Sequence, residues 1–421
     1  MRTSREELTW AKARSGPAPV EPFARALRAA ETELSAAFAI RRRYEEGLPG
    51  DAAARRQALV GVVGRCAEAG RRLDAEAAAF DRLRALERDL GGALDHAERR
   101  CRALAGPTAG TGATVAELGE RYGPMAAEPV RGHPEQAKDR LLFATAELDR
   151  ARRDADSDDT GRAVRHLRAA EGAITQADVF VGGVERLARQ LAEAAALVPS
   201  ALTGAEADLA QARGQVPRAP AARPGATGRR GAAGAPAARP GAPPPPQGRA
   251  AAYRIPFGEF RARLAHADAV LAAVRGKLTG GPYDPLDALR RIARAVEPVG
   301  AGRSGAVPLG GFLAARGATE IAEDFVTTHR AAVGAEARTL LAEAVRLLAR
   351  GDTRAADELA RTAREFAERD VRIHGNPYTG ESGYAAGLAG AVLGGVLLGE
   401  DPDGGPPATF GGPRSRDRLR P

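Results

Sequence analysis

The sequence predicts an all-α protein, built from antiparallel helical hairpins and bundles with coiled-coil character. Ala, Leu, Arg and Glu dominate the composition, and these residues are the strongest helix formers. Aromatic residues make up only 4% of the chain, so alanine and leucine must supply most of the core, which suits slender pairs of helices. The sequence also lacks the extended alternation of Val, Ile, Thr and Tyr that marks β-strands.

The N-terminal third predicts two long helices. Ser4 and Glu7 have the spacing of a capping box, which predicts that a helix begins there. The first amphipathic helix is predicted from apolar residues spaced four, three, four and three apart, namely Phe23, Leu27, Ala30, Leu34 and Ala37. Leu48-Pro49-Gly50 ends this helix, and Asp51 is suited to cap the next one.

The second helix carries an apolar residue at every seventh position, as coiled coils do. The series is Leu59, Cys66, Leu73 and Phe80. Cys66 is therefore expected in the core as a small hydrophobic residue, and so is Cys101, which shares a helix face with Leu94. Residues 106–113 are rich in small side chains and are expected to form a loop.

A further pair of antiparallel helices is predicted in the middle of the chain. Pro134 stands at the start of the first, whose buried stripe is Ala137, Leu141, Ala144, Leu148 and Ala151. The acidic residues 154–159 form a turn, and their carboxylates stabilise the positive end of the helix that follows. Such a short connection implies that the two helices are antiparallel neighbours.

Composition divides the chain into four predicted parts. Residues 217–252 are rich in Pro, Ala, Gly and Arg and cannot bury enough apolar surface to fold. We therefore predict an N-terminal helical bundle at 1–216, a disordered basic linker at 217–252, a C-terminal helical module at 253–380, and a glycine-rich apolar segment with a disordered tail at 381–421. Residues 297–317 resist assignment because glycine and alanine interrupt their periodicity.

The formal net charge of +8 lies in the linker region. Eight arginines and no acidic residue fall between positions 209 and 258, and the rest of the chain carries 54 basic and 54 acidic residues. A duplex-binding protein usually shows a folded basic face with base-reading or stacking residues. None is evident here, so nucleic acid is not an expected partner.

The chemistry-bearing residue types do not form a recognisable catalytic or metal motif. None of the six histidines has another four positions away, as a helical zinc pair requires, and neither cysteine has a second cysteine near it. The segment 276–279 has Leu278 where a phosphate-binding loop needs Ser or Thr. We expect no catalytic, cofactor or metal site, no bound cofactor and no enzymatic activity.

The segment 384–399 is apolar and rich in glycine. Gly390 and Gly394 form one small-xxx-small pair and Gly395 and Gly399 another, a spacing that lets helices approach closely. At about fifteen residues the segment is shorter than the roughly 20 that a membrane-spanning helix needs. Contact with a membrane surface, self-association and a coil without either role all remain open. The N-terminus lacks an apolar signal core, so we expect a cytoplasmic location.

Several phrases, taken in order, resemble the helical C-terminal region of high-GC bacterial proteins that begin with a TPM domain and a transmembrane span. They lie at residues 56–60, 65–69, 79–87, 134–137, 322–330, 333–338, 375–378 and 390–399. In that family the TPM domain is linked to phosphatase-like activity or to the maintenance of membrane complexes. That domain and its span have no counterpart in this sequence, so the resemblance assigns no catalytic residue here. It implies a helical arm in the cytoplasm, near the inner surface of the membrane.

The leading functional hypothesis is a non-enzymatic scaffold or adaptor. Its helical hairpins would present faces to an unknown protein partner or to another copy of the chain, near the inner membrane. The alternative is a peripheral membrane protein that associates through the segment containing Gly390. A phosphatase-type enzyme is implied only by the family resemblance.

Overall fold

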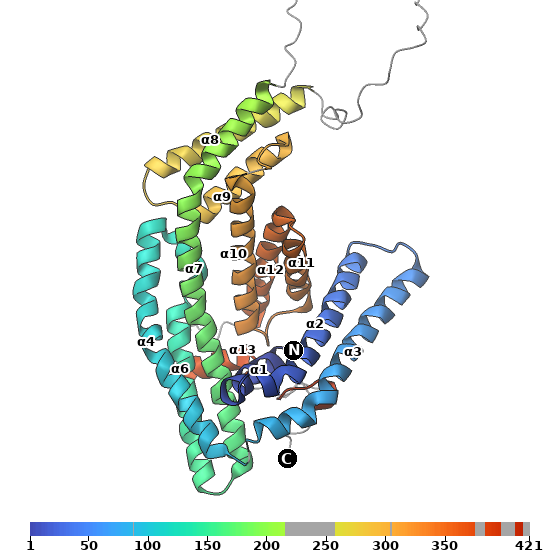
Figure 1. The fold of residues 1–421 in the computed structure, drawn as a ribbon, viewed down its shortest axis with the longest axis vertical. Helices are drawn as coiled ribbons and strands as arrows, with labels where there is room; N and C mark the ends of the chain where they lie inside the picture. The colour runs from blue at the N-terminus through green and yellow to red at the C-terminus, as the bar shows by residue number, and fades with distance from the viewer. Residues whose placement is uncertain (87, 215–256, 304, 375–383, 397–408, 416–421) are drawn as a thin grey trace, which may run out of the picture. The chain divides into compact units, whose positions relative to one another are not determined.

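The computed structural model describes residues 1–86, 88–214, 257–303, 305–374, 384–396 and 409–415 (Figure 1). Across these ranges the regular secondary structure is α-helix with three short 3-10 turns, at 128–130, 297–299 and 413–415, and no strand occurs in them. The prediction of an all-α protein is therefore confirmed. The predicted linker at 217–252 lies outside the described residues.

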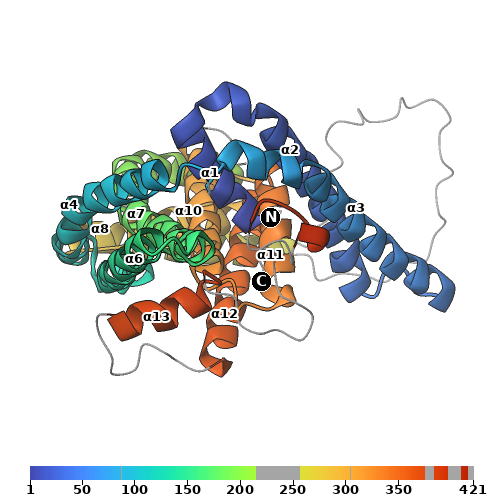
Figure 2. The same ribbon diagram turned by 90° about the horizontal axis from the view of Figure 1, so that it is seen from below.

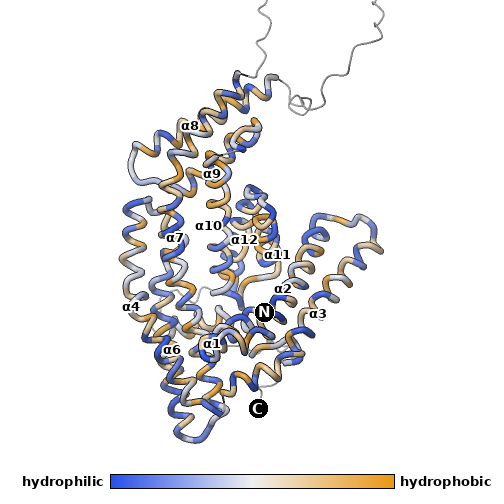
Figure 3. The backbone as a smooth tube through the Cα atoms, viewed as in Figure 1, coloured by the Kyte–Doolittle hydropathy of each residue, from blue (hydrophilic) through white to orange (hydrophobic). Residues whose placement is uncertain are grey.

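The described residues form the following helices in chain order. Those of the N-terminal half are α1 (Arg2–Ser15), α2 (Pro17–Glu45), α3 (Ala52–Arg84), α4 (Leu90–Tyr122), α5 (Pro124–Ala127), η1 (Glu128–Val130), α6 (His133–Asp156) and α7 (Thr160–Gly214). Those of the C-terminal half are α8 (Phe257–Thr279), α9 (Pro285–Val296), η3 (Glu297–Val299), α10 (Ala306–Thr328), α11 (Ala335–Ala349), α12 (Thr353–Ile373) and α13 (Tyr384–Leu393). Polar and apolar residues alternate along them, as amphipathic helices require (Figure 3).

The chain forms two compact units that do not follow the order of the sequence. The first unit comprises Met1–Ala196, Pro282–Leu286 and Gly311–Pro421, and the second comprises Leu197–Gly281 and Asp287–Gly310. This division differs from the modules expected at 1–216 and 253–380. The reason is physical: an amphipathic pattern marks which face of a helix is buried but not which helix covers it.

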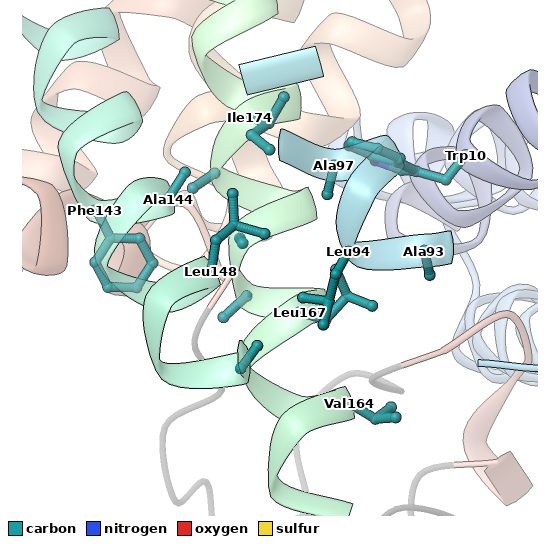
Figure 4. Close-up of a cluster of buried hydrophobic side chains, with 14 of the residues drawn as sticks. Trp10, Ala93, Leu94, Ala97, Phe143, Ala144, Leu148, Val164, Leu167 and Ile174 are labelled. Carbon is teal, nitrogen blue, oxygen red and sulfur yellow. The ribbon is translucent and has the colours of Figure 1, made fainter. Parts of the chain in front are cut away.

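In the first unit the largest contacts pair α2 with α3, α11 with α12, and α4 with α6. One core cluster lies where α4, α6 and α7 meet the end of α1 (Figure 4). It contains Trp10, Leu94, Ala97, Phe143, Ala144, Leu148, Leu167 and Ile174. Most of the alanines and leucines predicted for the buried stripe of α6 lie in it, which agrees with a core built from small and branched side chains.

The second unit is smaller and is closed by polar contacts between its helices. Buried Leu202 and Leu209 of α7, Leu271 of α8 and Ile292 of α9 supply apolar surface. Arg275 of α8 pairs with Glu206 of α7, and the backbone amide of Gly302 donates to Asp208 at 2.7 Å. Gly300 and Gly302 have φ of +72° and +71°, a region that favours glycine. These turns explain why 297–317 shows no period, although α10 begins at Ala306 within it.

Carboxylate caps begin several helices; the sequence predicts those at Asp51 and in the acidic turn 154–159, but not those at Asp89 and Asp352. Asp51, Asp89, Asp159 and Asp352 each accept a hydrogen bond from a backbone amide in the first turn of the helix that follows. The acidic residues 154–159 therefore do form a helix-capping turn between α6 and α7. Such caps satisfy amides that have no partner within the helix.

Two local predictions are wrong. The capping box at Ser4 and Glu7 does not open a helix, because α1 begins at Arg2 and both side chains are buried within it. The loop expected at 106–113 is instead the middle of α4, which continues through Pro107 to Tyr122. Glycine lowers helix propensity without forbidding a helix, and packing of the flanking turns overrides it.

Candidate interaction surface

The α2–α3 hairpin has a well-packed base. Phe23 and Leu27 of α2 lie with Leu73 and Phe80 of α3 in one buried cluster. The rings of Phe23 and Phe80 meet edge to face, with centroids 5.2 Å apart. These residues have the heptad and three-four spacing that predicted the two helices, so the base of the hairpin is as the sequence indicates.

The distal half of the same hairpin has no buried core. Every residue from 38 to 68 is at least partly exposed. Large apolar side chains are among them: Leu48 is 53% exposed, Leu59 46%, Val60 62% and Val63 68%. Leu59, Val60 and Val63 lie within about one turn of α3 and share its side. We call these three residues the distal stripe.

One residue of the distal stripe, Leu59, belongs to the heptad series that is buried farther along α3, whereas Val60 and Val63 lie outside that series. Leu59 and Cys66 are its first two members, and Leu73 and Phe80 its last two. The prediction that Cys66 is a core residue is wrong, because its side chain is exposed. Cys101, in contrast, packs against the α4–α6–α7 core cluster. The repeat identified the apolar side of α3 correctly, but no helix of the described residues covers its first half.

Arginines are frequent in the half of the hairpin that contains the distal stripe. Residues 41–65 contain six arginines and three carboxylates. Arg41 and Arg42 pair with Glu45 and Glu46 at 2.8 Å, and Arg65 pairs with Glu33 of α2 at 2.8 Å. After these pairings, residues 41–65 keep a net positive charge beside exposed apolar side chains. Such a surface favours a partner surface that carries carboxylates.

A small pocket lies between α2 and α11. Its volume is about 170 Å³, and its lining is mostly apolar: Ser35, Phe38, Ala39, Ala342, Glu343, Val345, Arg346 and Ala349. Val345 at its edge is 45% exposed. The volume is smaller than the ~300–1,000 Å³ typical of small-molecule sites. It fits a single side chain of a partner better than a substrate.

The glycines predicted as a membrane or self-association segment contact the chain itself. The helix α13 packs along α6 (Figure 2). A side chain at Gly390 would overlap the guanidinium of Arg140, and one at Gly394 would overlap Gln176. Gly395, with φ of +60°, accepts a hydrogen bond from Arg330 at 2.9 Å. Gly399 lies outside the described residues. The small-residue spacing thus permits a close approach within the chain, while membrane contact and self-association stay predictions.

Glu7, misread as a cap, belongs to a buried charged triad. The guanidinium of Arg84 lies 3.0 Å from a carboxylate oxygen of Glu7 and 2.5 Å from one of Glu171. All three side chains are at least nine-tenths buried. Burial raises the pKa of Glu171 to about 7. The triad ties α1, α3 and α7 together. Because its members are 164 positions apart at the extremes, no local pattern could have identified it.

The first unit also holds one half-buried histidine, His133, and one buried histidine, His329. His133 accepts or donates a hydrogen bond to the carbonyl of Phe180 at 3.2 Å, and His329 stacks on Phe325 with centroids 4.3 Å apart. Burial lowers the pKa of each to about 4, so both rings are neutral near pH 7. In the described ranges, no group of three His, Cys, Asp or Glu side chains is placed to hold a metal ion. No helix there is both long and apolar enough to cross a bilayer.

Comparison with known proteins yields relatives without a described activity. The chain is 29% identical over 428 aligned residues to UPF0603 protein MT2410 of Mycobacterium tuberculosis (strain CDC 1551 / Oshkosh) and to UPF0603 protein Rv2345 of the same species (strain ATCC 25618 / H37Rv). The alignment covers 98% of this chain but 61% of each relative. No family model matches the chain, and no solved structure matches it. The chain is thus similar, over nearly all of its length, to part of a longer UPF0603 protein.

Proposed function

We propose that the chain is a non-enzymatic helical scaffold or adaptor, and that the distal half of the α2–α3 hairpin is its docking surface. The observation that carries the proposal is the distal stripe. Exposed valines and leucines on a helix cost hydration free energy until another surface covers them. Leu73 and Phe80 of the heptad series are buried, whereas Leu59 of the same series is exposed beside Val60 and Val63. We infer that this exposed apolar part of α3 awaits a partner.

The partner surface is expected to combine an apolar strip with carboxylates. The arginines at 41–43, 55, 56 and 65 belong to the same half of the hairpin as the distal stripe, and charges at the rim of an interface select the partner and speed association. Either another protein or a second copy of the chain can provide such a surface. We further propose that this contact occurs in the cytoplasm near the inner membrane, as the resemblance to the helical region of TPM domain proteins implies.

Docking is tested by placing charge on the distal stripe. The double substitution Val60→Glu/Val63→Glu is expected to abolish cross-links between the hairpin and its partner, because it buries two carboxylates in an apolar interface. The measurement is cross-linking mass spectrometry of tagged chain from cells, with light scattering of the purified chain to detect a second copy. Both side chains are exposed, so the variant is expected to fold.

A matched control places the same charge elsewhere in the first unit. Met125 is 73% exposed on α5, and Met125→Glu is expected to leave the cross-links unchanged. If the double variant keeps the same cross-linked partner and the same oligomeric state, the distal stripe is not the docking surface. Phosphate release from aryl phosphates by the purified chain, abolished by one substitution, would contradict the non-enzymatic part of the proposal.

The alternative role, association with a membrane through the segment that contains Gly390, requires a rearrangement of α13. Association through α13 would require Gly390 and Gly394 to leave Arg140 and Gln176, and so to give up the packing of α13 on α6. Flotation with neutral and anionic liposomes measures whether this occurs. Flotation of the full chain with concurrent loss of α13 protection in hydrogen exchange would favour the membrane role over the scaffold role.

A further inference from the structure

Residues 409–415, here called the tail segment, return to the N-terminal helices and pack on α1, α2 and α3. The anchor of the tail segment is Phe410, which is fully buried. Its ring stacks on Phe80 of α3, with centroids 4.6 Å apart, and meets Phe23 of α2 nearly edge-on at 5.9 Å. Both are favoured geometries for aromatic pairs. One aromatic side chain therefore fills a slot between the two helices at the base of the hairpin.

A single carboxylate fixes the direction of the tail segment. Asp74 of α3 accepts hydrogen bonds from the backbone amide of Gly412 at 2.8 Å and from that of Arg414 at 3.2 Å. The hydroxyl of Ser415 donates to it at 2.7 Å. Bonds to a charged acceptor are stronger than neutral ones. Two backbone donors set the register and the serine adds side-chain selectivity.

Two glycines permit the close approach of the backbones. A Cβ atom at Gly70 of α3 would lie 2.7 Å from Cδ of Pro413, and one at Gly412 would overlap the carbonyl oxygen of Gly70. On α1, the hydroxyl of Ser4 lies within hydrogen-bond range of Gly411. Phe410, Gly412, Pro413 and Ser415 of the tail segment thus each make a specific contact with α2 or α3.

The surface that receives the tail segment is made by the hairpin itself. Phe23 and Phe80 contact each other, and Leu27 and Leu73 pack in the same cluster. We call the receiving residues Ser4, Phe23, Gly70, Asp74 and Phe80 the tail site. Seven consecutive residues make all of these contacts, which is the scale of a short peptide motif bound by one buried aromatic anchor and main-chain hydrogen bonds.

We infer that the tail site is a recognition site for peptide segments of the type Phe-Gly-Gly-Pro-x-Ser, and that the tail segment is its intramolecular occupant. The partner is a protein that carries such a sequence in a stretch able to form the same turn, in which the backbone amide of Ser415 donates to the carbonyl of Gly412 at 3.0 Å. A tethered occupant acts at an effective concentration of about 1 mM or less, depending on its linker. The tail segment therefore lowers the affinity for a partner without blocking the site permanently. This inference is independent of the distal stripe, because it rests on different residues.

The test uses the full chain and a fluorescent peptide with the sequence of residues 405–419. Gly412→Val ejects the tail segment but leaves every residue of the tail site unchanged. Peptide binding is measured by fluorescence anisotropy. The Gly412→Val chain is expected to bind the peptide at least about tenfold more tightly than the unaltered chain, because the tethered competitor is gone. Adding Asp74→Asn to the Gly412→Val chain, or changing the peptide phenylalanine to alanine, is expected to lower the affinity at least about tenfold.

A second variant that displaces the tail segment keeps the test valid if Gly412→Val does not fold. Phe410→Ala removes the anchor from the tail segment, and Phe312→Ala, which truncates a phenylalanine 40% exposed on α10, is the matched control that leaves the site occupied. Circular dichroism and thermal unfolding establish that each chain is folded. A dimer of the unaltered chain that Gly412→Val dissociates also supports the inference, with a second copy as donor of the segment. If folded Gly412→Val and Phe410→Ala chains do not bind the peptide at millimolar concentration, or bind the alanine peptide equally well, the inference is overturned.

Discussion

At the scale of single residues, the Glu7–Arg84–Glu171 triad is a buried electrostatic feature of the first unit. Two carboxylates share the guanidinium of Arg84 in a place that water hardly reaches. Removing charges from water is costly unless partners compensate. Burial therefore raises the pKa of Glu171 to about 7, well above its ordinary value of 4.5.

The raised pKa of Glu171 predicts how stability depends on pH. The folded chain holds this proton more tightly than the unfolded chain, so the contribution to stability is complete below about pH 4.5 and is lost as the pH rises toward 7. The free energy of unfolding of the unaltered chain, relative to that of Glu171→Gln, is expected to fall by up to about 3 kcal/mol between pH 5 and pH 8. Urea unfolding at several pH values measures it.

The control for this pH dependence is Glu135→Gln. Glu135 is largely exposed on α6, and its variant is expected to differ from the unaltered chain by a nearly constant amount over the same range. A difference between the unaltered chain and Glu171→Gln that does not change with pH would show that Glu171 titrates normally. The sequence could not have indicated the triad, because Glu7 and Glu171 become neighbours only through the packing of α1 and α7.

At the scale of helices, α4 shows how packing decides what propensity leaves open. Residues 106–113 contain three glycines and a proline and predict a loop, yet they continue a helix of 33 residues. The turns on either side are held by buried Leu94 and Ala97 before the segment and by Leu118 and Tyr122 after it. Each helical residue also adds a hydrogen bond to a helix that is already nucleated.

Because Gly110 lies within α4, we expect the substitution Gly110→Ala to stabilise the chain. A Cβ at Gly110 would meet nothing within 4 Å, and its residue is exposed in the middle of α4. Alanine restricts the unfolded chain more than glycine does, so the substitution is expected to raise the free energy of unfolding by about 0.5–1 kcal/mol. Thermal unfolding measures the change. The neighbouring Ala109→Gly should lower stability by a similar amount, and a destabilising Gly110→Ala would indicate a loop instead of a helix.

In the α2–α3 hairpin, the heptad pattern identified the apolar side of α3 correctly, but the prediction that Cys66 is buried on that side is wrong. The heptad Leu59, Cys66, Leu73 and Phe80 correctly predicts one apolar side of α3. Whether a position on that side is buried depends on the length of the helix that covers it and on where that helix turns. The sequence therefore predicted the apolar side of α3, while the exposed distal stripe emerged only from the tertiary structure.

At the scale of the whole molecule, the C-terminal residues stabilise the N-terminal ones. Ala391 and Leu393 of α13 and Phe410 of the tail segment are buried in clusters formed with helices from the first unit. A chain that ends at Gly380 loses all three. Its free energy of unfolding is expected to fall by at least about 4 kcal/mol, the scale of burying one leucine and one phenylalanine. Chemical unfolding followed by circular dichroism measures this loss.

A chain that ends at Ser415 is the control for this truncation, because it keeps every contact of α13 and of the tail segment that the structure describes. It is expected to be as stable as the full chain. Equal stability of the chain that ends at Gly380 would mean that α13 and the tail segment do not pack in solution. Because the chain that ends at Gly380 loses the packing of α13 and of the tail segment, liposome flotation should be measured on the full chain.

The sequence by itself determined the fold class, most of the helices, the carboxylate caps at Asp51 and at residues 154–159, and the apolar side of α3. These features depend on local spacing, on helix propensity and on hydrogen bonds within one turn. Only the tertiary structure decided that residues from 311 onward join Met1–Ala196 in one unit, that Arg84 serves both Glu7 and Glu171, and that Phe410 fills a slot between α2 and α3. The physical reason is that these contacts join residues far apart in the chain. Apolar burial is non-directional and can be satisfied by many pairings of amphipathic helices, so local spacing does not determine which residues meet.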